Sequence, residues 1–131
     1  MAVVALQGDV IVGAYLDEYQ MLPRAETTGV PNSDKAFGEA FANPEQALGS
    51  KKVNSEYYSN NMTKAGSTVT IANNFKALEE FVVGMTVAEL EELLTNNDKE
   101  AMVDMVTGAT LADNYGYLTA FWAAAKDAQS K

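Results

Sequence analysis

The sequence contains neither cysteine nor histidine among its 131 residues. The lack of cysteine excludes disulfide bonds, four-cysteine zinc sites and thiol nucleophiles. The lack of histidine removes the Ser-His-Asp and Cys-His catalytic arrangements and the metal sites that depend on imidazole. The commonest catalytic and metal-binding residue sets are therefore missing, and we predict no catalytic residues and no resident metal.

Basic residues are also few. Nine lysines and arginines stand against eighteen aspartates and glutamates, giving a formal net charge of −9. Such a chain repels a phosphate backbone or an anionic membrane face unless a local basic patch intervenes, and Lys51-Lys52 is the one basic pair. We therefore expect no nucleic-acid partner.

Long hydrophobic runs are absent as well. Residues 1–9 have no basic n-region and too short an apolar run to be a signal peptide. The longest uncharged apolar stretch near the C-terminus, residues 117–125, is far below the roughly 20 residues needed to cross a bilayer. The sequence predicts no membrane span in this chain and shows no export signal of its own.

What is present predicts one compact domain over residues 1–131, because 47% of the residues are apolar and can form a core. Residues 3–7 and 10–19 are rich in Val, Ile, Leu and Tyr, and Gly8-Asp9 between them is typical of a type II′ hairpin turn. The hairpin would pair Leu6 with Ile11 and Ala5 with Val12.

The end of this hairpin is expected at Asp17-Glu18-Tyr19, where the second strand would emerge towards solvent. Apolar stripes then predict helices at about 70–83, 87–95 and 112–128. Gly84 would end the first of them, and Thr86 with Glu89 forms a capping box that begins the second.

Residues 101–105 are expected to be a short strand that joins the hairpin. The fold class is therefore predicted as α+β, a small antiparallel sheet with an N-terminal hairpin packed against three or more helices. Between the hairpin and the first long helix, residues 23–66 are interrupted by all three prolines and read as loop-rich, with a helical turn or two at 55–62.

The most informative stretch is residues 104–110, with the sequence Asp-Met-Val-Thr-Gly-Ala-Thr, placed just before the C-terminal helical stripe. Gly108 permits the backbone angles of a tight turn, and Ala109 keeps the surface open. Thr110 would then present its hydroxyl at the mouth of a helix, whose free N–H groups favour an anion such as a phosphate.

This string resembles the Asp-x-x-(Ser/Thr)-Gly-Ala-Thr signature of the FMN-binding domain family. The resemblance implies that FMN is attached through its phosphate to Thr110 by a separate flavin transferase, which uses FAD and a divalent metal. It implies a recognition or loop-ordering role for Asp104, and places Thr107, Gly108 and Ala109 in the same cofactor-binding segment. It further implies an extracytoplasmic or cell-envelope electron carrier with redox partner proteins, whose leader has been removed or left out.

Several alternatives stand beside this interpretation. Thr110 could be a plain helix N-cap, and Asp104 could order the turn through hydrogen bonds to backbone N–H groups. Residues 66–78 echo 108–118, with a Gly-small-Thr junction before a helical stripe in both, so Thr68 is a rival attachment site.

Tyr57 and Tyr58 are candidates for stacking on a flavin ring, or else one packs in the core and the other is exposed. At the level of the whole chain, the alternative function is a flavin-free ligand-binding or interaction module with a pocket around residues 24–66. An enzyme acting alone ranks third, because the sequence offers no acid, base and nucleophile set.

Overall fold

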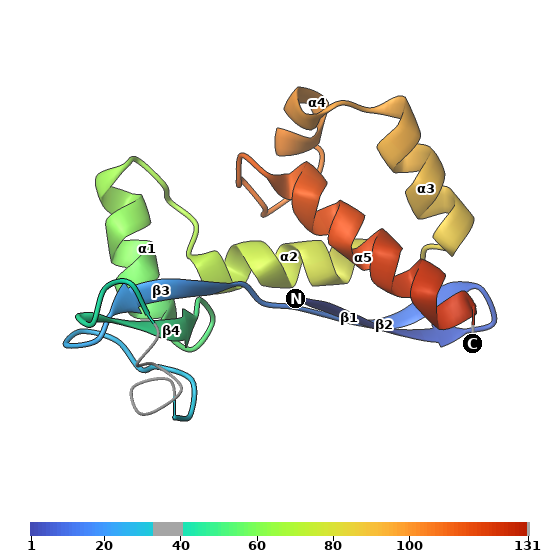
Figure 1. Ribbon diagram of the computed structural model, residues 1–131. Helices are drawn as coiled ribbons and strands as arrows, with labels where there is room; N and C mark the ends of the chain where they lie inside the picture. The colour runs from blue at the N-terminus through green and yellow to red at the C-terminus, as the bar shows by residue number, and fades with distance from the viewer. Residues whose placement is uncertain (33–40, 131) are drawn as a thin grey trace. The chain divides into compact units, whose positions relative to one another are not determined.

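The computed structural model describes residues 1–32 and 41–130 (Figure 1). Within these residues the chain forms two compact units, one made of residues 1–16 and 73–131 and the other of residues 17–72. The second unit is thus inserted in the sequence of the first. The expectation of a single domain stays a prediction.

The first unit contains the hairpin and most of the helices. Its elements are the antiparallel strands β1 (Ala2–Gln7) and β2 (Val10–Leu16), then α2 (Ile71–Val82), whose first two residues belong to the second unit, α3 (Val87–Asn96), α4 (Lys99–Val103) and α5 (Asn114–Gln129). The predicted α+β class, with an N-terminal hairpin and helices, is confirmed.

The hairpin register agrees with the expectation at its turn and departs from it further along. Leu6 pairs with Ile11 as predicted, but a bulge follows, so Ala5 lies opposite Gly13 instead of Val12. A bulge adds one residue to one strand, and nothing in the apolar pattern of these strands marks it.

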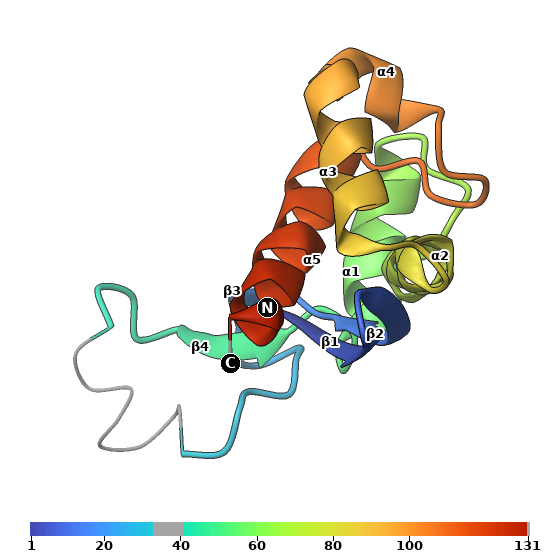
Figure 2. The same ribbon diagram turned by 90° about the vertical axis from the view of Figure 1, so that its right-hand side faces the viewer.

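Helix α5 packs against β1, and both α3 and α4 pack against α5 (Figure 1; Figure 2). Phe75, Leu78, Leu118, Phe121 and Ala125 are all fully buried, so the apolar faces of α2 and α5 form much of the core. The stripes that predicted these helices are therefore core faces.

The signals predicted for the end of α2 and the start of α3 are both present. Gly84 has a φ of +95°, which fits its place just after the end of α2. The Thr86 hydroxyl accepts a hydrogen bond from the Glu89 backbone N–H while the Glu89 carboxylate accepts one from the Thr86 N–H, completing the capping box.

The expected strand at residues 101–105 is wrong, because this segment is the short helix α4 followed by a turn. The Asp98 side chain accepts a hydrogen bond from the Ala101 backbone N–H at 2.9 Å and so caps the new helix. No other strand among the described residues joins β1 and β2, so the hairpin is a two-stranded sheet.

The second unit contains a small sheet that the sequence reading missed. Strands β3 (Tyr19–Pro23) and β4 (Gln46–Ser50) pair antiparallel, and helix α1 (Ser55–Lys64) follows them. The helical turns expected at 55–62 are confirmed. Residues 33–40 of the segment predicted as loop-rich lie outside the described residues.

Asp17 corrects the expectation that the hairpin emerges into solvent there. Strand β2 ends at Leu16, and Asp17 is only 1% exposed. Its carboxylate accepts hydrogen bonds from the Ser50 hydroxyl and from the backbone N–H groups of Glu18 and Lys52. Three hydrogen-bond donors offset the cost of burying this charge. The apolar periodicity of the sequence cannot predict such donors.

Candidate functional site

The candidate site is the loop of residues 104–113, which joins α4 to α5 in the first unit. Asp104 caps the C-terminal end of α4, and Thr107 and Gly108 lie in a turn. Among the described residues Asp104 makes no side-chain hydrogen bond or ion pair, so no contact supports its alternative role in ordering the turn. Its carboxylate is exposed and accessible to another molecule.

Thr110 does not lie at the mouth of the C-terminal helix. Helix α5 begins four residues later, at Asn114, and its N-cap is Asp113, whose carboxylate accepts a hydrogen bond from the Gly116 N–H at 3.2 Å. Both the phosphate site at the helix N-terminus and the alternative of Thr110 as N-cap are therefore wrong. A carboxylate already occupies that end and would repel a phosphate.

Buried and exposed residues divide the loop into anchors and a displayed edge. Val106 and Ala109 are 3% and 1% exposed and pack into the unit. Thr107, Gly108 and Thr110 are exposed. Thr110, whose hydroxyl is the candidate site of flavin attachment, therefore lies on the surface. The buried side chains of Val106 and Ala109 hold this part of the loop in place.

Asn74 of α2 provides one polar anchor. Its side-chain oxygen accepts a hydrogen bond from the Thr110 backbone N–H at 2.7 Å, and Asn74 itself is fully buried. The sequence reading missed this residue. A signal for it exists, because Asn74 lies three residues after Ile71 and one before Phe75, on the apolar face of an otherwise amphipathic helix.

Asn114 provides the second polar anchor and was also missed. Its side-chain N–H₂ group donates to the backbone oxygens of Met102 and Val103 at 3.2 Å and of Ala109 at 3.0 Å. Asn114 is fully buried, and its side-chain oxygen has no hydrogen-bond partner. One amide thus ties the end of α4, the loop and the start of α5 together.

The internal echo in the sequence coincides with these anchors. Gly66 and Gly108 occupy equivalent positions of the echo and have similar φ angles of +94° and +88°. Asn74 and Asn114 also occupy equivalent positions, and both are fully buried. The two junctions therefore share a glycine conformation and a buried asparagine, although Thr68 has no counterpart of Asp104.

Gly108 also lies close to α2. A β-carbon built at this position would come within 3.3 Å of the Ala77 side chain. The positive φ and the close approach both favour glycine here, so the glycine of the motif has a structural reason in this chain.

A shallow hollow of about 290 Å³ lies beside the turn of the loop. It is lined by Ala77, Glu80 and Phe81 of α2 and by Met105, Val106 and Thr107 of the loop. Its lining combines an aromatic ring, a thioether and aliphatic groups with one carboxylate. This composition suits a flat, largely apolar group that carries a few polar atoms.

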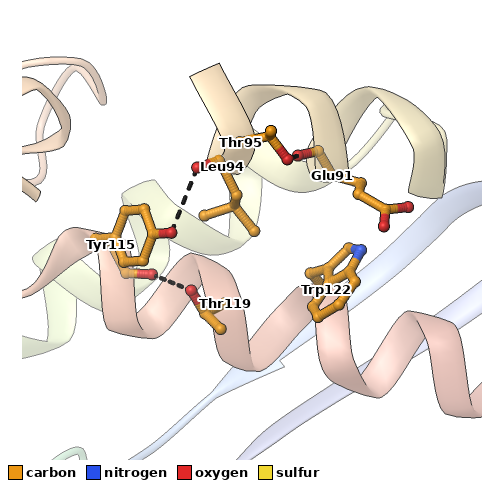
Figure 3. A pocket seen from close by; sticks show the side chains of 6 residues that line it. All are labelled: Glu91, Leu94, Thr95, Tyr115, Thr119 and Trp122. Atoms are coloured by element: carbon orange, nitrogen blue, oxygen red, sulfur yellow. Dashed lines mark hydrogen bonds between the residues drawn. The ribbon is translucent and has the colours of Figure 1, made fainter. Parts of the chain in front are cut away.

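A second hollow, of about 190 Å³, lies between α3 and α5 (Figure 3). The hydroxyls of Thr95, Tyr115 and Thr119 that line it donate to backbone oxygens of Glu91, Leu94 and Tyr115, respectively. Its polar lining is therefore largely satisfied within the helices. The Trp122 indole N–H is buried without a partner.

The two tyrosines proposed for stacking belong to the second unit. Both are half-buried, so the alternative of one core and one exposed ring is wrong. Tyr57 lines a polar hollow of about 330 Å³ together with Glu26, Asn54 and Glu56. Tyr58 has one ring face under the Lys51 ammonium, 4.4 Å from the ring centroid.

Lys51 is itself 5% exposed and forms an ion pair with Glu18 at 2.9 Å. Burial disfavours its charge, but hydrogen bonds to Tyr58 and Glu18 and the charge of Glu18 outweigh that effect, and the pKa of Lys51 is raised from 10.5. Lys51 therefore remains charged and keeps this face of Tyr58 covered.

Among the described residues, no group of three or more acidic side chains lies close enough together to hold a metal ion. No helix in the described part of the chain is long and apolar enough to span a bilayer. The acidic residues of α3 are solvated, as expected for Glu89, Glu91 and Glu92.

The comparisons with known proteins add no relative. No family model matches the chain, and neither a curated protein nor a solved structure matches it. The features of this chain that point to a function are therefore the loop itself and its resemblance to the FMN-binding signature.

Proposed function

We propose that this protein is a flavin-carrying redox domain, with FMN attached by a phosphoester bond to Thr110. The observation that carries the proposal is the exposed Thr110 side chain on a loop anchored by Val106, Ala109 and Asn114. A transferase needs an acceptor that is accessible and held in place, and this loop satisfies both needs.

The attachment would be a transfer reaction catalysed by another protein. The Thr110 oxygen attacks the phosphorus of the FMN half of FAD, the pyrophosphate P–O bond breaks, AMP leaves, and the hydroxyl proton passes to a base of the transferase. A threonine hydroxyl needs such activation, and the loop contributes no base of its own beyond the carboxylates of Asp104 and Asp113, the second of which caps α5. We assign Asp104 to recognition by the transferase.

The residues of this loop fit the cofactor in part. The hollow at Phe81, Met105 and Thr107 has the apolar and aromatic lining that suits a flavin ring. The phosphate would remain in solvent, because Asp113 caps the helix that follows the loop and the sequence has no lysine or arginine between Lys99 and Lys126. When bound, the flavin supplies the electron chemistry, and the protein sets its position and surroundings.

The same proposal includes the partners and the compartment. A carrier of this kind exchanges electrons with redox partner proteins and is modified by a flavin transferase, in an extracytoplasmic or cell-envelope location. The resemblance of residues 104–110 to the family signature supports these partners and this compartment. The carrier itself is not expected to be an enzyme.

The test is peptide mapping by mass spectrometry after co-expression with a flavin transferase. Thr110→Val keeps the β-branched shape and removes the hydroxyl, so we expect it to abolish modification. Thr68→Val, outside the signature of residues 104–110, is the matched control that leaves the acceptor intact and should be modified as the unchanged protein is. Flavin on Thr68 would move the site to the first junction of the echo.

The alternative is a flavin-free ligand-binding or interaction module. The polar hollow at Glu26, Glu56 and Tyr57 in the second unit supports it. This reading is favoured if no residue of the unchanged protein carries flavin after transferase treatment.

A further inference from the structure

Asn74 of α2 contacts the backbone of Thr110, the candidate site of flavin attachment. We infer that Asn74 is a positioning residue for Thr110, holding the acceptor backbone so that the hydroxyl is presented in a fixed direction. The inference rests on the proposed flavin attachment and adds to it a residue on α2, 36 positions away in sequence. Asn74 lies outside the signature of residues 104–110.

An asparagine at position 74 is costly for the fold. Asn74 is fully buried between Ile71 and Phe75 on the core face of α2, where the neighbouring core positions carry apolar side chains. An asparagine is a weak helix former, and burying its amide is unfavourable unless it is hydrogen-bonded. A departure from the local pattern of this kind is expected where function demands it.

The geometry of the contact between Asn74 and Thr110 also favours a positioning role. The hydrogen bond from the Thr110 N–H to the Asn74 side-chain oxygen is short, at 2.7 Å, and reaches the acceptor residue itself. Threonine is stiff about χ1, so a fixed backbone leaves its hydroxyl few directions. Phosphoryl transfer needs the attacking oxygen in line with the bond that breaks, so holding the backbone favours the reaction.

The other anchors of the loop hold residues that precede Thr110. Asn114 binds the backbone oxygens of Met102, Val103 and Ala109, all of which precede Thr110. The apolar anchors are Val106 and Ala109. The Asn74 bond holds the acceptor residue directly and ties it to α2.

The experiment uses the full chain and three substitutions. Asn74→Leu has nearly the same shape but lacks the side-chain oxygen that accepts the hydrogen bond from the Thr110 N–H. Asn74→Asp keeps an oxygen within reach of the Thr110 N–H. Asn73→Leu, at the exposed neighbouring position of the same helix, is the matched control. Each is measured for cooperative unfolding, for amide hydrogen exchange at Thr110 by NMR, and for flavin incorporation by a transferase.

We expect Asn74→Leu to unfold cooperatively, to exchange the Thr110 amide about fivefold to tenfold faster, and to take up flavin about tenfold more slowly or worse. Asn74→Asp should restore amide protection and most of the incorporation. Asn73→Leu should match the unchanged protein in exchange and in flavin uptake.

The outcomes separate this inference from the proposed function. A folded Asn74→Leu protein that is modified at the unchanged rate overturns the positioning role while the flavin function stands. An unprotected Thr110 amide in the unchanged protein overturns it even if Asn74→Leu fails to fold. If the unchanged protein takes up no flavin although its Thr110 amide is protected, the proposed function is wrong. The positioning role is then wrong too, because Thr110 has no flavin to accept.

Discussion

At the scale of single residues, the loop depends on a buried amide that satisfies several backbone oxygens at once. The Asn114 N–H₂ group donates to three of them, while its own side-chain oxygen is left without a partner. A buried acceptor without a hydrogen bond carries a cost of about 1–3 kcal/mol. The two N–H groups of this amide, shared among three carbonyl oxygens, offset this cost.

We predict that Asn114→Ala lowers the free energy of unfolding by about 1–3 kcal/mol, because the three backbone oxygens lose their donor. Urea denaturation of the unmodified protein measures the change. Asn96→Ala, at the exposed C-terminal end of α3, is the control and should change stability little. Equal effects of the two substitutions would show that the buried amide does not hold the loop.

At the scale of elements, the turn of the motif is held close to α2 by a glycine. Gly84 and Gly108 have φ angles of +95° and +88°, but only Gly108 has a neighbour where a β-carbon would lie, the Ala77 side chain at 3.3 Å. The two glycines therefore separate the cost of the backbone conformation from the cost of crowding.

We predict that Gly84→Ala lowers the free energy of unfolding by about 1 kcal/mol, as expected for a left-handed conformation alone. Gly108→Ala should cost about 1–3 kcal/mol, since it adds contact with α2 to the same strain. Thermal unfolding of both variants gives the comparison. A smaller loss for Gly108→Ala would contradict the close approach of the loop to α2.

The stability of the N-terminal end of α3 depends on pH. The Glu89 carboxylate accepts hydrogen bonds from the Thr86 backbone N–H and hydroxyl at 2.8 and 2.9 Å, and these bonds lower the pKa of Glu89 from 4.5. Because the pKa is lower in the folded state, the contribution of this carboxylate is present above pH 4.5 and is lost as the pH falls through the folded pKa.

We predict that Glu89→Gln is less stable than the unchanged protein near neutral pH, and that this difference disappears as the pH falls below 4.5 and through the lowered pKa of the folded state. Urea unfolding at a series of pH values measures it. Glu92→Gln, at an exposed position of the same helix, is the matched control. A difference that persists unchanged in acid would show that the charge of Glu89 has no part in the cap.

At the scale of the whole molecule, the described core is built from apolar faces that need no cofactor. The fully buried side chains include Ile11, Phe75, Leu90 and Phe121, which come from the hairpin and from three helices of the first unit. The hollow beside the motif loop is at the surface of this core. Flavin would therefore be added to a unit that is already folded.

We predict that protein made without a transferase is colourless and still unfolds cooperatively on heating. Differential scanning calorimetry of unmodified and flavin-modified protein is the measurement. Cooperative unfolding confined to the flavin-bound form would show that the cofactor is part of the core.

The sequence by itself determined the elements that depend on local chemistry. The apolar stripes of α2 and α5, the Gly84 ending and the capping box of Thr86 were all predicted, because each depends on residues within a few positions of one another. The hairpin turn at Gly8-Asp9 and the α+β class followed from the same kind of evidence. So did the choice of residues 104–110 as the candidate site.

Tertiary structure decided what depends on residues far apart in the chain. Pairing of β3 with β4 and burial of Asp17 by donors from β4 and the turn after it were not predicted. The contact between Asn74 and Thr110 belongs to the same class. A buried polar group is stabilised only by partners that the fold brings to it, and no local pattern names those partners.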